Sequence, residues 1–289
     1  MNNFINSPTD KKQFQNQTIY IKRDDLLSQD FSGNKARKFH YYLAHEFPHI
    51  QKVLSYGSAQ SNAMYSISVL AKKQGWEFNY YTTHIADYLK ENPHGNYKYA
   101  LENGMKIYVE QSTPVPSTDK TTLFVEEGGR QQEAEYGLEI LAKEIESWKK
   151  EQHIEELNIF LPSGTGTTAL FLQKYTKDRV YTTPCVGGVD YLKEQFLMLE
   201  KDKNFHPTIL TPSKKRHFGK LYRESYNIWL ELQDKMGIEF DLLYDPHGWL
   251  TLLENPQIFE KPTLYIHQGG LIGNESMLAR YQRKYSENI

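Results

Sequence analysis

One lysine stands out as a residue that could do covalent chemistry. Lys35 lies in the segment Ser32–Lys38, which reads Ser-Gly-Asn-Lys-Ala-Arg-Lys, at the start of a helix predicted over 35–47. A lysine in the first helical turn faces the positive end of the helix dipole, which disfavours its charged form. The Ser-Gly pair allows a sharp turn and leaves space for a bulky group, and Asn34 is a favourable N-cap. Such an amine, beside free backbone N–H groups, suits Schiff-base formation with an aldehyde that carries a phosphate.

The same segment has a second interpretation. Basic residues at a helix start can form a solvated cluster that binds nothing, and short motif matches often arise by chance. The choice between the two depends on what the rest of the chain places beside Lys35.

Composition bounds the class of protein. The chain has 289 residues, of which 39% are hydrophobic and 24% charged, and its formal net charge is -2. These values are typical of a globular protein and give no electrostatic signature for nucleic acid or an anionic membrane. The single Cys185 excludes an internal disulfide and a cysteine-cluster metal site, and we expect no metal. Because residues 1–17 are polar and no apolar run reaches transmembrane length, we expect a cytoplasmic protein.

Strand and helix signals alternate along the chain. Apolar runs predict strands near 18–27, 52–57, 78–82, 105–109, 122–126, 157–161, 180–182, 208–210 and 263–267. Amphipathic spacing predicts helices between them, the clearest over 60–74, 131–152, 189–201 and 221–236. This alternation indicates βαβ units and parallel sheets.

Four turns that contain glycine follow predicted strands, at 57–58, 128–129, 163–168 and 269–270. Ligands of parallel α/β proteins bind beyond the carboxyl ends of the strands, where such turns gather. The segment Ser163–Thr168 is the best phosphate cradle, because small residues expose backbone N–H groups just before a helix. It lacks the Gly-Lys-Ser/Thr ending of a nucleotide P-loop, and a plain strand–helix turn is the alternative.

A second polar cluster follows the strand over 52–57. The segment Gly57–Asn62 carries short hydrogen-bonding side chains at a helix start, which suits binding a carboxylate or a ring hydroxyl. A capping box with a polar first turn is the alternative. Three other candidates are weaker: Asp24-Asp25 suits a turn, Cys185 a neutral thiol, and His267 a structural hydrogen bond as well as catalysis.

Taken together, these segments resemble one family. The segments 22–38 and 57–62 resemble the lysine motif and the Gln-Ser-Asn motif of the 1-aminocyclopropane-1-carboxylate (ACC) deaminases and D-cysteine desulfhydrases. These enzymes depend on pyridoxal phosphate. The segments 127–129, 163–168 and 267–270 follow in the family's order and spacing, and the similarity spans about 21–273.

The resemblance implies a fold and a set of roles. The fold is the two-domain α/β tryptophan-synthase-β-like fold (fold type II), with a larger cofactor-binding domain over 1–40 plus 143–289 and a smaller one over 41–142. Lys35 would form the Schiff base with the cofactor. The phosphate would be bound by Lys38, Ser163, Gly164, Thr165, Gly166 and Thr167, and the pyridoxal ring by Asn62 and Gln268. Ser61 would bind the substrate carboxylate or act as a nucleophile, and the substrate site would include Ser58, Gln60, Asn62 and Tyr244.

The sequence departs from the family at two places. The family pattern Asp-Pro-x-Tyr-Thr/Glu-Gly-Lys reads Asp245-Pro-His-Gly-Trp249 here, so its tyrosine and its deaminase glutamate are missing. Tyr244, His247 or Trp249 would have to take the place of the tyrosine. Gln268 stands where the desulfhydrases have a threonine near the pyridine nitrogen, and an amide gives a weaker electron sink than a carboxylate. This favours elimination of a good leaving group over opening of a cyclopropane ring.

We therefore expect α,β-elimination or deamination of a small amino acid such as D-cysteine, giving a keto acid and ammonia. ACC deamination is the alternative within enzymes. A protein that binds pyridoxal phosphate without turnover is the alternative from another class, and a cofactor-free nucleotide-binding module leaves Lys35 unexplained. The resemblance also implies a homodimer.

Overall fold

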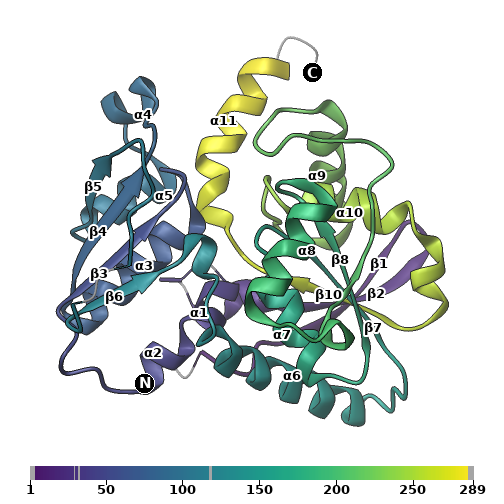
Figure 1. Ribbon diagram of the computed structural model, residues 1–289. Coiled ribbons are helices and arrows are strands. Elements are labelled where there is room, and N and C mark those ends of the chain that lie inside the picture. The colour runs from purple at the N-terminus through teal and green to yellow at the C-terminus, as the bar shows by residue number, and fades with distance from the viewer. Residues whose placement is uncertain (1–3, 29, 32, 117–118, 286–289) are drawn as a thin grey trace.

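Two sheets organise the chain in the computed structural model, which describes residues 4–28, 30–31, 33–116 and 119–285 (Figure 1). The larger sheet has the order β1-β2-β10-β7-β8-β9. Its strands are β1 (Thr9–Phe14), β2 (Gln17–Arg23), β7 (Asn158–Ser163), β8 (Arg179–Pro184), β9 (Thr208–Ile209) and β10 (Thr263–His267). The smaller sheet has the order β5-β4-β3-β6, with β3 (Lys52–Tyr56), β4 (Glu77–Thr82), β5 (Lys106–Val109) and β6 (Thr122–Val125).

The small sheet is parallel throughout, and in the large sheet only β1 runs antiparallel to its neighbour β2. The expectation of mostly parallel sheets is therefore confirmed. The sequence analysis missed β1, because its residues Thr-Asp-Lys-Lys-Gln-Phe are mostly polar and only Phe14 is buried. A hairpin at Gln15-Asn16, both with positive φ, joins β1 to β2.

Eleven α-helices pack around the two sheets in the described part of the chain. The helices are α1 (Asn34–Lys38), α2 (His40–Ala44), α3 (Asn62–Gln74), α4 (Asp87–Glu91), α5 (Gly95–Glu102), α6 (Ala134–Glu151), α7 (Thr167–Tyr175), α8 (Gly188–Leu199), α9 (Arg223–Met236), α10 (Asp245–Leu253) and α11 (Asn274–Tyr285). Of the described helices, none combines the length and apolar character needed to cross a membrane.

Helix α6 packs in the same apolar core as strands of the large sheet. Its buried residues Ala134, Leu138, Leu141 and Ile145 pack in one apolar cluster with residues of β7, α7 and β10. The domain boundary predicted at 142/143 falls inside this single helix. We therefore propose that the smaller domain ends before α6.

The predicted helix over 35–47 is two short helices, α1 and α2, interrupted at Phe39. Ser32 of the lysine motif lies outside the described residues, and the N-cap of α1 is Gly33, with φ 36°, where Asn34 was expected. A Cβ added at Gly33 would lie 2.1 Å from the carbonyl oxygen of Gln268. The positive φ of Gly33 therefore allows the turn, as expected. The space beside Gly33 is filled by the backbone of residues 268–269, so it is not the space for a bulky group that the sequence suggested.

Candidate functional site

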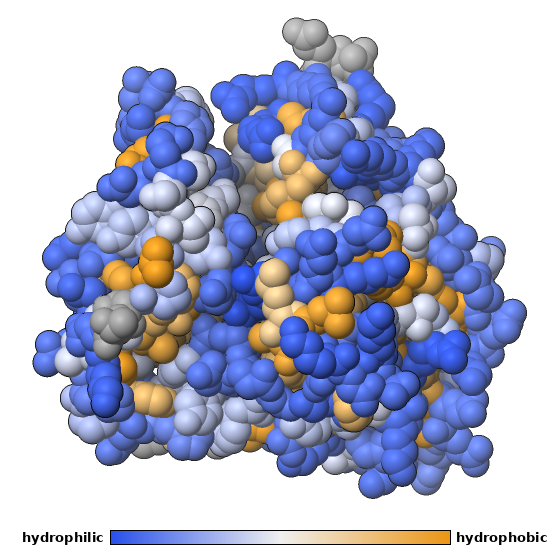
Figure 2. Space-filling model, in the orientation of Figure 1, coloured by the Kyte–Doolittle hydropathy of each residue, from blue (hydrophilic) through white to orange (hydrophobic). Residues whose placement is uncertain are grey.

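The residues predicted to bind cofactor and substrate come together. Strands β2, β7 and β10 are parallel; Ser163 ends β7, and the segments after β2 and β10 carry Lys35 and Gln268. A cavity of about 430 Å³ is lined by every predicted site residue, namely Lys35, Lys38, Ser58, Gln60, Ser61, Asn62, Ser163, Gly164, Thr165, Gly166, Thr167, Tyr244 and Gln268. Figure 2 shows a hollow between the lobe built on the small sheet and the lobe built on the large sheet. The volume suits a small organic ligand.

The half-buried Lys35 presents its amine to this cavity. Burial lowers the pKa of its amine to about 8, and the nearby Asp241 carboxylate opposes that shift. Its Nζ donates to Asn34 Oδ1 at 3.0 Å, while the Asn34 amide donates to Gln268 Oε1 at 2.7 Å and Thr168 Oγ1 at 3.2 Å. A lysine with a lowered pKa has a larger neutral fraction near neutral pH, which attack on a carbonyl carbon requires.

Lys38 lies one helical turn further on and is only 4% exposed. Its Nζ donates to the Gly128 carbonyl at 3.0 Å, and the described residues offer it no carboxylate partner. Burial and the neighbouring Lys35 hold the pKa of the Lys38 amine well below its usual value. A buried ammonium without a counter-ion is costly, so an anion bound here would be strongly favoured.

The predicted phosphate cradle lies at the start of α7. Gly166, with φ 72°, precedes the helix, and a Cβ there would lie 2.4 Å from the Phe196 ring. The hydroxyls of Thr165 and Thr167 lie 3.1 Å apart beside the first N–H groups of the helix. The Ser163 hydroxyl is 2.6 Å from that of Thr182 on β8, so its side chain bonds within the sheet.

The cavity is also lined by Ser58, Gln60, Ser61 and Asn62. Ser61 is the N-cap of α3, and its Oγ accepts from the N–H of Ala63 at 3.1 Å and of Met64 at 3.4 Å. The capping interpretation therefore holds for Ser61, whose hydroxyl proton is not used by these two bonds. Asn62 Oδ1 accepts from Asn96 Nδ2 at 2.7 Å, which fixes the amide at the cavity edge.

Both polar atoms of the Gln268 side-chain amide form hydrogen bonds. Its Nε2 donates to the Pro162 carbonyl at 2.6 Å, and its Oε1 accepts from Asn34. A primary amide carries two N–H hydrogens, and these contacts use one of them. The other is the group that Gln268 can offer to a ligand.

Of the three candidates for the missing tyrosine, only Tyr244 lines the main cavity. A Cβ at Gly164 would lie 3.4 Å from the Tyr244 ring, so the ring borders the phosphate cradle. His247 lines a separate small cavity, and burial lowers its pKa to about 4. Trp249 is buried and stacks on Tyr265, with ring centroids 4.6 Å apart.

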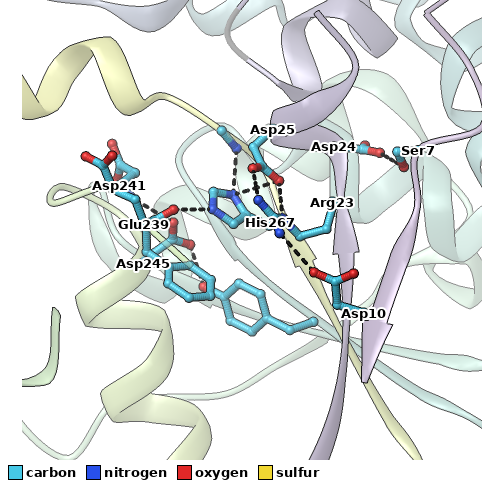
Figure 3. Close-up of polar contacts among 12 residues, drawn as sticks. Ser7, Asp10, Arg23, Asp24, Asp25, Glu239, Asp241, Asp245 and His267 are labelled. Atoms are coloured by element: carbon cyan, nitrogen blue, oxygen red, sulfur yellow. Dashed lines mark hydrogen bonds and ion pairs between the residues drawn. The ribbon is translucent and has the colours of Figure 1, made fainter. Parts of the chain in front are cut away.

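The sequence analysis missed two acids beside Tyr244, Asp241 and Asp245, which Figure 3 shows next to Glu239 and His267. Asp245 lines the cavity, and its Oδ1 accepts from the Tyr265 hydroxyl. Burial and the nearby Asp241 raise its pKa well above the usual range. Burial also raises the pKa of Asp241 to about 6, although Leu243 and Tyr244 donate backbone N–H groups to its Oδ1.

Asp241 Oδ2 is buried without a hydrogen-bond partner among the described residues. It faces Gly270, where an added Cβ would lie 3.1 Å from this oxygen and 2.7 Å from Asn62 Nδ2.

The spacing of Asp241 and Asp245 around Tyr244 in the sequence could have revealed these two acids. The family pattern has an acid three residues before its tyrosine and, in the deaminases, another directly after it. Aligned on Tyr244 instead of on Asp245-Pro246, the chain has Asp241 and Asp245 at those two places.

His267 has a structural role, which was one of its two interpretations. Its ring is fully buried, and Nε2 lies 2.7 Å from the Glu239 carbonyl (Figure 3). The Gly269 N–H donates to Nδ1 at 3.1 Å, so Nδ1 is the acceptor and Nε2 carries the hydrogen. Burial lowers the pKa of the ring, which favours this neutral form.

The expectation of no metal overlooked an HExxH pattern at His45–His49. This pattern binds zinc when both histidines project from one face of a helix. Here α2 ends at Ala44, and His45 has extended backbone with φ -124° and ψ 160°. Its Nδ1 lies 2.9 Å from the carbonyl oxygen of Tyr41, so the local structure does not provide the helical arrangement.

Replacing Asp241 by asparagine should raise stability in a pH-dependent way. The folded-state pKa of about 6 exceeds the ordinary 3.8, so the folded protein holds a proton that the unfolded chain loses between these values. Wild-type stability therefore falls as pH rises through this window, whereas asparagine does not titrate. We expect the apo variant to gain about 1–3 kcal/mol at pH 8 and much less at pH 4. Urea unfolding at both pH values measures this, and an equal difference at both would contradict it.

The chain matches no family model and no curated protein in sequence. In structure it is similar to an ACC deaminase homologue, with a TM-score of 0.78 and 19% identity over 96% of this chain and 94% of that chain. A hydrogen sulfide-producing enzyme from Fusobacterium nucleatum has a TM-score of 0.60 and 10% identity over 93% and 97% of the two chains. A pyridoxal 5'-phosphate-dependent aspartate racemase has a TM-score of 0.60 and 12% identity over 91% and 90%. The chain therefore has the fold that these proteins share, the tryptophan-synthase-β-like fold that the sequence resemblance predicts.

Proposed function

We propose that this chain is a pyridoxal-phosphate-dependent enzyme that eliminates or deaminates a small amino acid to a keto acid and ammonia. The observation that carries the proposal is the pair Lys35 and Lys38, two amines with lowered pKa values that line one cavity. One amine suits Schiff-base formation, and the other lacks an anion. The structural neighbours support the proposal, since one is described as dependent on this cofactor.

The residues fit the cofactor. Its phosphate would lie against Lys38 and the N-terminus of α7, with Thr165 and Thr167 as donors. Its aldehyde would react with Lys35, and its ring would lie between Asn62 and Gln268. A Cβ at Gly166 would clash with Phe196 and Leu192, so this glycine allows the turn into α7 that carries the cradle.

When bound, pyridoxal phosphate supplies an electron sink for the bonds at the substrate Cα. Lys35 Nζ moves the Cα proton, because its lowered pKa places the amine near the range of an efficient general base. The Ser58–Asn62 segment binds the substrate carboxylate through the Ser61 hydroxyl, whose hydrogen is not used in capping α3. Tyr244 lines the same cavity, where its ring excludes water and orients the substrate.

We keep D-cysteine as the first candidate substrate, since Gln268 offers an amide and the neighbours include a hydrogen sulfide-producing enzyme. ACC deamination gains support from Asp245, which places an acid directly after Tyr244 in the cavity wall, and from the ACC deaminase homologue among the neighbours. The two candidates differ in leaving group and are separated by a substrate panel.

The test is spectroscopic and then chemical. The purified protein, incubated with pyridoxal phosphate, should show a visible Schiff-base band, and borohydride reduction should fix the cofactor mass on the peptide that contains Lys35. Keto acid release from D-cysteine, L-cysteine and ACC then identifies the reaction. A band that changes on adding an amino acid without product would favour the non-catalytic binder, and a protein that stays colourless would refute the proposal.

A further inference from the structure

A third cation lines the cavity, and the proposed chemistry does not use it. Arg280 lies on α11, the helix that begins after the 269–270 turn and runs between the two lobes (Figure 1). Lys35 and Lys38 are assigned to the aldehyde and the phosphate of the cofactor. Arg280 comes from a different segment of the chain and borders the cavity beside Phe218 and Gly219.

The Arg280 guanidinium has only weak or neutral partners. Its Nη2 donates to the Gly219 carbonyl oxygen at 2.9 Å, and its Nη1 lies 3.1 Å from the Met277 sulfur. Among the described residues no carboxylate forms an ion pair with it, whereas Arg23, Arg37 and Arg216 each pair with at least one carboxylate. A guanidinium has five N–H donors in a planar fork, and these two contacts use only two of them.

The cavity thus provides two places for substrate anions. The Ser58–Asn62 segment at the start of α3 belongs to the small-sheet lobe and suits the α-carboxylate common to all amino acids. Arg280 reaches the cavity from α11 and suits a second anionic group. A substrate that uses both sites carries a negative charge on its side chain.

We propose that Arg280 binds an anionic group at the end of the substrate side chain, so that the site selects acidic amino acids over neutral ones. This inference rests on the proposed function and changes its substrate class, because D-cysteine and ACC have no anionic side chain and would bind less tightly than an acidic amino acid. The shared chemistry is an oxyanion that accepts hydrogen bonds from the guanidinium fork, and a carboxylate or a phosphate ester can supply it.

The experiment measures binding by the change in the visible band when the holoenzyme is titrated with amino acids. D- and L-forms of aspartate and glutamate supply a carboxylate, O-phosphoserine supplies a phosphate, and alanine and serine are the neutral references. Wild type should bind at least one anionic amino acid about tenfold or more tightly than the neutral ones. Preference for aspartate or glutamate assigns a carboxylate, and preference for O-phosphoserine assigns a phosphate.

Arg280→Gln should weaken binding of the preferred amino acid by about ten- to a hundredfold and leave alanine binding within about twofold. Arg280→Lys, which keeps the charge but loses the fork, should retain part of the preference. The matched control is Arg283→Gln on the same helix, because Arg283 lies over the Tyr88 ring at 5.4 Å and does not line the cavity. That variant should bind like wild type.

Equal binding of neutral and anionic amino acids by wild type would overturn the inference. So would an Arg280→Gln or Arg280→Lys variant that weakens both classes equally, which is the result of a purely structural role. A protein without the visible band would instead refute the proposed function, so the two failures are distinguishable.

Discussion

Replacing Lys35 by alanine should remove the visible Schiff-base band and lower turnover by about 10⁴-fold or more. The variant loses both the amine that bonds the aldehyde and the base that moves the Cα proton. The amine is held by Asn34 and has no close substitute, since Lys38 already bonds the Gly128 carbonyl. Absorbance after incubation with pyridoxal phosphate, and keto acid release by wild type and variant, measure the two effects.

Lys38→Ala provides the matched comparison. It removes a buried amine of the same helix but leaves Lys35 in place, so the band should persist while the cofactor dissociates more readily on dialysis. Burial and the neighbouring Lys35 lower the pKa of the Lys38 amine, and a bound phosphate would favour its charged form. A wild-type band in Lys35→Ala, or a lost band in Lys38→Ala with a retained one in Lys35→Ala, would assign the Schiff base to another lysine.

Replacing Arg37 by methionine should destabilise the protein by about 3–5 kcal/mol. Arg37 is fully buried and pairs with Asp24 at 2.8 Å and Glu144 at 2.5 Å, and it joins α1 to α6. Methionine fills a similar volume but leaves the Asp24 carboxylate buried with only the Ser7 hydroxyl as a side-chain partner. Glu144 keeps Lys22 at 3.0 Å, so Asp24 is the group that carries most of the cost.

Urea unfolding of the apo protein measures this effect. The control is Lys143→Met, which breaks the exposed pair between Lys143 and Glu139 on the same helix and should change stability by no more than about 1 kcal/mol. Because Arg37 lies two residues after Lys35, the folded variant should also show a weaker or shifted Schiff-base band. Similar stability losses in the two variants would show that the buried network contributes no more than a surface pair.

Much of the fold could be predicted from the sequence because most strands are apolar runs with clear ends. The strand predicted over 263–267 is β10 itself, and the helices predicted over 60–74 and 221–236 differ from α3 and α9 by two residues at one end. β1 was missed because an edge strand has polar residues on one face. The break at Phe39 was missed because α1 and α2 share a continuous helical pattern, and tertiary packing separates them.

The sequence predicted the cavity-lining residues that belong to short local motifs. Lys35, the Ser58–Asn62 segment and the Ser163–Thr167 cradle are short motifs, and all of them line the cavity. Asp241 and Asp245 were missed because the family pattern was aligned on Asp245-Pro246 and not on Tyr244. Arg280 was missed because an arginine on a polar helix has no local feature that marks it as part of a cavity.

The pairing of β2 with β10 has a consequence for the order of folding. Tyr20 pairs with Leu264 and Ile21 with Tyr265, so the strand before the lysine segment obtains its inner neighbour from near the opposite end of the chain. The Asn34 N–H also donates to the carbonyl oxygen of Gln268, just after β10. Contacts between residues so far apart in sequence form late and slow the folding of a domain. During synthesis, Lys35 therefore emerges early from the ribosome but reaches its place in the cavity only after β10 has joined the sheet.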